Sequence, residues 1–152
     1  MIGNLENALA QLEQTLGTFC QFLEEEAMAL AGQDAEKLAA MLPRRDETHR
    51  MLATHWLRLA KLAGTDNPQG LADLRQRLFG QAPPPQAWLR LEELVHASDR
   101  LNKVNGRLME EQMRRTQVAL QILQHSVTSR GVYDAGGRLT DFLNQNRRID
   151  SA

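Results

Sequence analysis

Apolar residues recur every three or four positions along most of the chain, which is the spacing of an α-helix with one buried face. The pattern is most regular near the start, where steps of four and three alternate before one final step of seven. The residues concerned are Leu5, Leu9, Leu12, Leu16, Phe19, Leu23 and Leu30. A heptad repeat of this length is typical of a coiled-coil seam. It predicts a first helix roughly 42 Å long, ending near Gly32.

A second apolar stripe predicts a helix from Asp34 to Leu62. Because only Gly32 and Gln33 separate it from the first helix, the two helices are expected to be antiparallel neighbours. Pro43 lies inside the second stripe. A proline lacks the backbone N–H and clashes with the preceding turn, so we expect a kink or a short break there.

Turn-forming residues bound a short third helix, which is predicted over residues 71–79. The loop before it, residues 64–70, is rich in Gly, Asn, Asp and Pro, and the connector after it contains Pro83-Pro84-Pro85. A proline run cannot be helical, and this one is interpreted as a stiff linker rather than a docking ligand.

The longest stripe predicts a helix from about Gln86 to Arg130. Its seam is more polar than that of the first helix, because Ser98, Asn105 and Gln112 all lie at inner positions. A polar residue at an inner position commonly fixes the register of a helix or the number of its partners.

The two methionines of this long stripe could have either of two roles. Met109 and Met113 would also suit an adaptable contact surface, but a plain core role is the preferred interpretation. Gly131 is expected to end the helix, and residues 132–137 are expected to form a turn.

The last part of the chain has a different character. Its apolar residues Leu139, Phe142, Leu143 and Ile149 lie mostly on one side of a short helix. Such a helix is marginal alone, because nucleation is costly, so it needs a groove on its own bundle or on a partner.

These elements predict an all-α fold. We expect an elongated antiparallel helical bundle or coiled coil of long helices with a short amphipathic C-terminal segment. The 152 residues fit one domain or one rod. The expected division is a helical bundle body, residues 1–130, and a C-terminal segment, residues 131–152.

Charge balances over the whole chain but not along it. The chain carries 18 basic and 19 acidic residues, a net charge of -1, which argues against a nucleic-acid binder acting through bulk charge. The first 34 residues hold six acidic residues and no Lys or Arg. This acidic segment is expected to lie beside the more basic later ones; the alternative is solvated helix faces that happen to differ in sign.

Targeting signals and enzyme motifs are not found. No stretch approaches 18 uncharged apolar residues, so no membrane insertion is expected, and the start lacks the pattern of a signal peptide. The chain shows none of the glycine-rich phosphate loops, nucleophile elbows or zinc-protease motifs of common enzymes. The single cysteine, Cys20, is expected to be a buried inert thiol. We therefore predict a cytoplasmic protein that is not an enzyme and needs no cofactor.

One arrangement could suggest a metal site. Glu93 and His96 have the Glu-x-x-His spacing of metal-binding bundles, and Asp46 with His49 offers a second element. Acids and histidines are common on helices, so chance accounts for these matches and no metal is assigned. The arginine pairs have acids nearby and lack interleaved aromatics, so no nucleic-acid partner is assigned either.

Taken in order, these features resemble the FlgN-type export chaperones of the bacterial flagellum, which are type III secretion chaperones. The resemblance covers nearly the whole chain. It rests on the leucine-rich helical hairpin, on Asn102 and Asn105 three apart in the long helix, and on Tyr133 with Gly137 opening the C-terminal segment. Pro43 and the later proline run depart from it.

The resemblance implies a cytosolic chaperone that binds hook-associated proteins of the hook-filament junction, FlgK and FlgL. It would prevent their premature polymerisation and deliver them to the export gate protein FlhA. Client binding in the family maps to the amphipathic C-terminal segment. Here the matching residues are Leu139, Phe142, Leu143 and Ile149.

Gate docking in the family involves a tyrosine ahead of that segment, and Tyr133 is its match. Such a chaperone is expected to be a monomer or a weak homodimer. The alternative is a generic coiled-coil scaffold or adaptor protein without a flagellar role.

Overall fold

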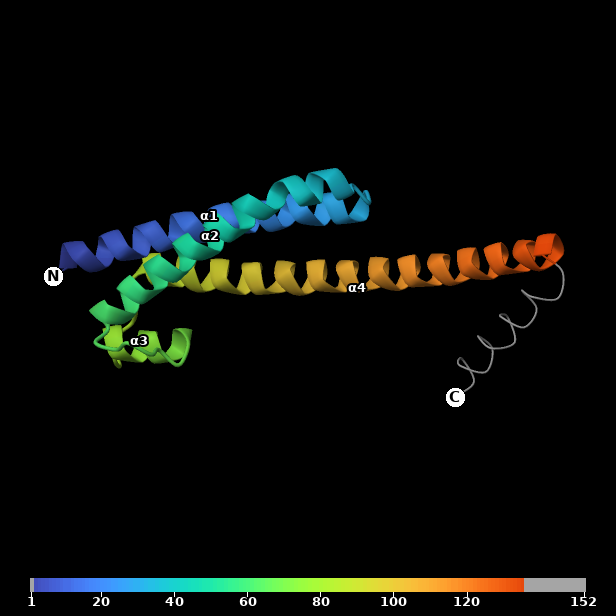
Figure 1. Cartoon of the computed structure of the whole chain (residues 1–152). Coiled ribbons are helices and arrows are strands. Elements are labelled where there is room, and N and C mark those ends of the chain that lie inside the picture. The colour runs from blue at the N-terminus through green and yellow to red at the C-terminus, as the bar shows by residue number, and fades with distance from the viewer. Residues whose placement is uncertain (1, 136–152) are drawn as a thin grey trace. The chain divides into compact units, whose positions relative to one another are not determined.

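The computed structural model describes the backbone of residues 2–135 and the side chains of residues 3–127. Within this part of the chain every regular element is a helix (Figure 1). The helices are α1 (Ile2–Ala31), α2 (Ala35–Leu62), α3 (Leu71–Phe79) and α4 (Gln86–Ala135). The all-α prediction is confirmed. The chain forms two compact units, Met1–Leu108 and Met109–Ala152, so α4 contributes its first part to one unit and the rest to the other.

The connection between α1 and α2 is tight, and the backbone N–H groups of residues 32–34 are all hydrogen-bonded. The N–H of Gln33 donates to the carbonyl oxygen of Leu30 at 3.1 Å, and that of Asp34 to Ala29 at 3.0 Å, which is the bond pair of a Schellman motif. Gln33, rather than a glycine, takes the left-handed conformation, with φ of 53°. The Asp34 carboxylate then accepts the Lys37 N–H at 3.1 Å and caps α2. The predicted antiparallel hairpin is confirmed, with α1 and α2 side by side (Figure 1).

α1 is the central helix of the first unit. The heptad stripe predicted from the sequence is buried, with Leu5 packed at its edge. α1 also buries a second line at heptad spacing, consisting of Ala8, Thr15, Phe22 and Ala29. Two buried lines make a face wide enough for two neighbours, and α1 packs against both α2 and the first part of α4.

The core of this unit consists of two apolar clusters. The larger cluster takes residues from all four helices: Ala8, Leu9, Leu12, Leu16, Leu59, Ala60, Leu74, Trp88 and Leu91. The smaller one lies toward the hairpin turn and consists of Phe19, Phe22, Leu23, Ala29 and Met41. Trp88 is fully buried; its ring meets the edge of Phe79 at 5.4 Å, and its Nε1 donates to Glu92 at 2.6 Å. The short helix α3 is thereby held against the start of α4.

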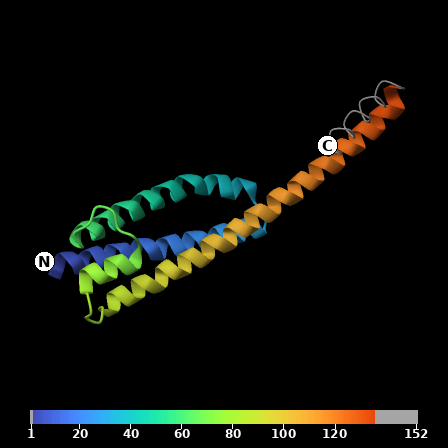
Figure 2. The same ribbon diagram turned by 90° about the horizontal axis from the view of Figure 1, so that it is seen from below.

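Of the kink or short break expected at Pro43, the break is absent. α2 is continuous through this proline, and Figure 2 shows the helix curving along its length. The missing N–H leaves the carbonyl of Ala39 without its helical donor. The two residues that follow, Arg44 and Arg45, form ion pairs with α1, which holds the chain in helical register beyond the proline.

The end of α4 also differs from the expected one. Gly131 does not stop the helix, and residues 132–135, expected in a turn, are its last turn. A glycine inside a helix costs only about 1 kcal/mol relative to alanine, so one glycine is a weak stop. The helix ends at Ala135, directly before Gly136 and Gly137. The division into residues 1–130 and 131–152 stays a prediction.

Candidate functional site

The predicted binding residues lie at or beyond the limit of the described structure. Tyr133 is in the last turn of α4, and its side chain lies outside the described residues. Leu139, Phe142, Leu143 and Ile149 lie outside them entirely. Their roles in client binding and gate docking stay predictions.

A buried polar cluster joins three helices of the first unit. Asn105 of α4 is 1% exposed and Glu26 of α1 is 4% exposed. The Asn105 side-chain nitrogen donates to the Glu26 carboxylate at 3.0 Å and to the carbonyl oxygen of Leu23 at 2.9 Å. Arg45 of α2 donates to the same Glu26 oxygen at 2.7 Å. One carboxylate oxygen therefore ties α1 to both of its neighbours.

The position of this cluster corresponds to an irregularity in the sequence. The final step of seven in the first stripe skips residue 26, where an apolar residue would continue the steps of four and three. Glu26 occupies that inner position, and the guanidinium of Arg45 lies 5.9 Å from the centre of the Phe22 ring. Asn105 was recognised from the sequence as an inner polar residue. Its partners were not, because they lie on other helices far along the chain.

We expect the cluster to fix how the helices align. Sliding α4 along α1 would take the Asn105 donor away from the buried Glu26 carboxylate, which is costly. Two buried atoms, Asn105 Oδ1 and Arg45 Nε, have no hydrogen-bond partner, so the site retains some unused hydrogen-bonding capacity. Specifying the register of neighbouring helices is the best-attested role of an inner polar residue in helical assemblies.

The acidic first segment does lie beside basic residues, as expected. In addition to the buried pair, Arg90 of α4 donates to Glu13 at 2.8 Å, and Arg44 of α2 donates to Glu25 at 3.0 Å. The hydrogen bond from Arg44 and its positive charge lower the pKa of Glu25. Three of the six acidic residues of this segment, Glu13, Glu25 and Glu26, therefore pair with arginines of later helices, while Glu6 and Glu24 are exposed.

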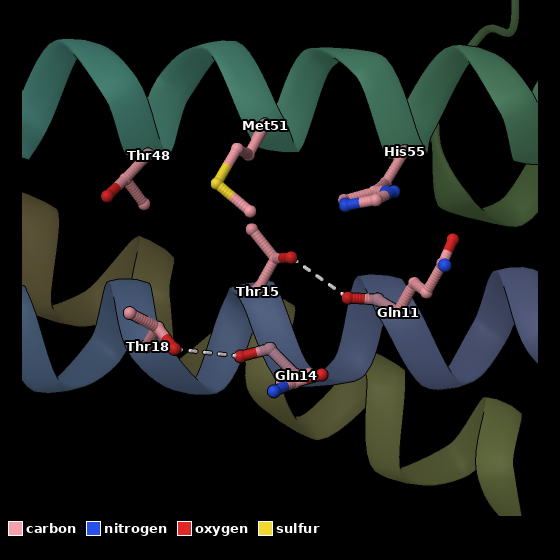
Figure 3. Close-up of a pocket in the computed structure, with 7 residues that line it drawn as sticks. All are labelled: Gln11, Gln14, Thr15, Thr18, Thr48, Met51 and His55. Atoms are coloured by element: carbon pink, nitrogen blue, oxygen red, sulfur yellow. Dashed lines mark hydrogen bonds between the residues drawn. The ribbon is translucent and has the colours of Figure 1, made fainter.

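A groove lies between α1 and α2 and has a volume of about 360 Å³. Figure 3 shows Thr48, Met51 and His55 of α2 facing α1 across it. The lining residues of α1 are Gln11, Gln14, Thr15 and Thr18. The hydroxyls of both threonines donate to carbonyl oxygens of their own helix. The residues that line the groove include no Asp, Glu, Lys or Arg. The groove therefore holds no pair of an acidic and a basic side chain.

Cys20 and His49, considered above as possible catalytic or metal-binding residues, make contacts with other parts of the fold. Cys20 donates to the carbonyl oxygen of Leu94 at 3.7 Å, and burial together with the charge of Glu24 raises the pKa of its thiol. A raised pKa disfavours the reactive thiolate. The His49 ring packs edge-on against Phe19 at 5.3 Å. Among the residues that the structure describes, no group of three or more His, Cys, Asp or Glu could hold a metal ion.

The second part of α4 does not give Met113 the core role expected of it. Met113 is 65% exposed, and other large apolar residues here are similarly exposed. They are Val118, Leu120, Ile122, Leu123 and Val127. The prediction that Met113 lies in a core is therefore wrong for a single copy of the chain. Met109 is partly buried. Apolar spacing showed that this helix has an apolar face, but it could not show whether anything covers that face.

Comparison with known proteins identifies one relationship. A family model described as FlgN protein matches residues 1–141. No curated protein and no solved structure matches the chain. The matched range includes Tyr133 and Leu139 and stops one residue before Phe142. Within the described residues, none of the helices combines the length and apolar character that a membrane crossing requires.

Proposed function

The chain belongs to the FlgN family of flagellar export chaperones, and from this premise we propose which clients it serves and how. It binds the hook-filament junction proteins FlgK and FlgL and keeps them unpolymerised in the cytoplasm. It then delivers them to the export gate protein FlhA. The family match over residues 1–141 is the observation that carries this proposal.

The proposed division of labour follows the chain. Residues 1–130 form the helical body. The residues after it bind the clients, through Leu139, Phe142, Leu143 and Ile149, while Tyr133 docks to the gate. A short apolar stripe of this kind would cover a helical segment of a client by packing along it. Ordering two flexible partners costs part of the contact free energy, so affinity would be moderate and release at the gate feasible.

The second part of α4 is available for contact with another protein chain. It exposes several large apolar residues between Met113 and Val127. Exposed apolar residues that are grouped in one region often mark a surface that binds another molecule. The buried polar cluster, by contrast, belongs to the helical body. It keeps the helices of the body in register while the other end of the chain binds a client.

Binding of purified FlgK and FlgL tests the proposal directly. The full chain should bind both clients, and a chain truncated after Gly131 should bind neither. Phe142→Ala combined with Leu143→Ala should abolish binding without changing thermal stability. Leu57→Ala is the matched control, because Leu57 is an exposed leucine on α2 (49% exposed) and should bind as the unchanged chain does.

Other results would redirect the proposal in specific ways. Equal binding by the truncated chain would keep the function and move the client site onto the helical body. A large loss of stability in the Phe142/Leu143 variant would show that these residues belong to a packed core. Failure of the full chain to bind either protein would favour the alternative, a helical scaffold without these clients.

A further inference from the structure

The exposed part of α4 carries an uncovered coiled-coil seam. Within the second unit, six positions follow steps of four, three, four, three and four, the same spacing as in α1. They are Met109, Met113, Thr116, Leu120, Leu123 and Val127, called the α4 seam below. All except the partly buried Met109 are exposed, including Leu120 at 52% and Val127 at 68%. In α1 this spacing is buried, whereas in α4 nothing within the described residues covers it.

Thr116 fits this seam as an apolar residue. Its hydroxyl donates to the carbonyl oxygen of Gln112, one turn earlier, at 2.9 Å. The hydroxyl therefore needs no partner from another chain, and the methyl group is left to pack. The seam has no position that would bury an unsatisfied polar group on pairing.

We propose that the occupant of the α4 seam is a second copy of this chain, packed antiparallel. If Leu120 of one copy lies against Thr116 of the other, the remaining layers follow without a gap. Met113 then meets Leu123, and Met109 meets Val127, each twice around a two-fold axis. An interface that is complementary to itself in this way is the normal basis of a two-fold dimer.

The flanks of the seam permit this pairing. In coiled coils, charged residues beside the seam usually select the partner and its orientation. Here the flanking residues are Gln112, Gln117, Ala119, Gln124 and Ser126, with Glu110 as the one charged member. In the antiparallel register Glu110 faces Gln124, so no like charges oppose each other. Neutral flanks remove the repulsion that would keep identical helices apart.

Residues 136–152 alone are too few to cover the same surface. The seventeen residues 136–152, even if all helical, would extend about 26 Å. Folding back from Ala135, they would reach roughly residue 118 and leave Met109, Met113 and Thr116 uncovered. An extended segment could reach further, but its side chains alternate between faces and do not match a heptad seam.

Cysteine cross-linking tests both the partner and the orientation. The natural cysteine is first replaced, Cys20→Ser, and Ala119→Cys is then introduced. In the antiparallel register the two residues at position 119 lie beside the two-fold axis. Mild oxidation should therefore produce a covalent dimer, whereas Gln121→Cys, on the outer side of the helix, should produce little. Equal cross-linking at both positions would overturn the proposal.

Sedimentation of the full chain over a range of concentrations gives an independent readout. The weight-average mass should rise toward a dimer, and Leu120→Asp should weaken association by about tenfold or more, because it places a charge in the seam. Ile122→Asp is the matched control: Ile122 is 63% exposed but lies off the seam, so its dimerisation should be unchanged. A monomer at every concentration would refute the proposal. Dimerisation that appears only after truncation behind Ala135 would do the same, because it would identify the C-terminal residues as the occupant.

Discussion

The side-chain amide of Asn105 lies 3.0 Å from the Glu26 carboxylate, although the two residues are 79 positions apart in the chain. Asn105 is at an inner position of α4, and Glu26 fills the one gap in the heptad stripe of α1. The two polar residues that interrupt these apolar patterns therefore contact each other. Each is tolerated in the core because the other is there.

Replacing Asn105 by alanine should destabilise the first unit by about 2–3 kcal/mol. The substitution removes the buried donor that the Glu26 carboxylate and the carbonyl of Leu23 share. Urea denaturation followed by circular dichroism measures the change. Asn102→Ala is the matched control, since Asn102 is on the same helix one turn earlier and is exposed; it should change stability by less than about 0.5 kcal/mol. Equal effects of the two substitutions would show that the buried amide does not hold the helices in register.

Two neighbouring ion pairs between α1 and α2 form a natural comparison. Glu26–Arg45 and Glu25–Arg44 join the same two helices, but the Glu26 side chain is 6% exposed and that of Glu25 is 45% exposed. A double-mutant cycle on Glu26 and Arg45 should give a coupling free energy of about 1.5–3 kcal/mol. The Glu25–Arg44 cycle should give a smaller value, because solvent screens exposed charges.

Salt and pH separate these two pairs further. Raising the salt concentration should weaken the Glu25–Arg44 coupling much more than the Glu26–Arg45 coupling. Because folding lowers the pKa of Glu25, its stabilisation is present above the ordinary glutamate range and is lost as the pH falls through the lowered value. Coupling at Glu25–Arg44 that persisted unchanged at low pH would contradict the ion-pair assignment.

The helical architecture of the first unit could be predicted from the sequence because it depends on local spacing. The stripe from Leu5 to Leu30 gave α1 and its buried face, and the short spacing around Gln33 gave the antiparallel hairpin. The left-handed residue could not be predicted, since Gly32 was the better candidate on conformational grounds. Gln33 adopts that conformation because two backbone hydrogen bonds close the turn around it.

The candidate sites were less predictable for a physical reason. Periodicity identifies an apolar face but not its partner, so Met113 was assigned to a core that the structure does not provide. The partner of Asn105 depended on packing between distant helices, and no local signal pointed to Glu26 beyond the skipped step. The family resemblance supplied the functional assignment, which apolar spacing alone could not give.

Pro43 is expected to reduce the stability of α2, so Pro43→Ala should raise the free energy of unfolding by about 1–3 kcal/mol. Alanine restores the backbone donor to the carbonyl of Ala39, and the gain is partly offset because the proline also restricts the unfolded chain. Thermal unfolding measures the shift. Leu42→Ala, at an exposed neighbouring position, should have little effect. A loss of stability in Pro43→Ala would mean that the curvature of α2 at the proline is needed to bring Arg45 to Glu26.

The last prediction separates the two proposed binding events at the end of the chain. Tyr133 is the chain's single tyrosine and lies in the last turn of α4, ahead of the proposed client-binding residues. Aromatic residues often carry a large share of the binding free energy at an interface, so Tyr133→Ala should weaken binding to FlhA by about tenfold or more. Binding to FlgK and FlgL should stay unchanged, as measured by titration calorimetry with each purified protein. His125→Ala is the control, because His125 is exposed on the same helix. This variant should bind FlhA, FlgK and FlgL as the unchanged chain does. If Tyr133→Ala lost clients and gate together, one surface would serve both, and the separation of roles along the chain would be wrong.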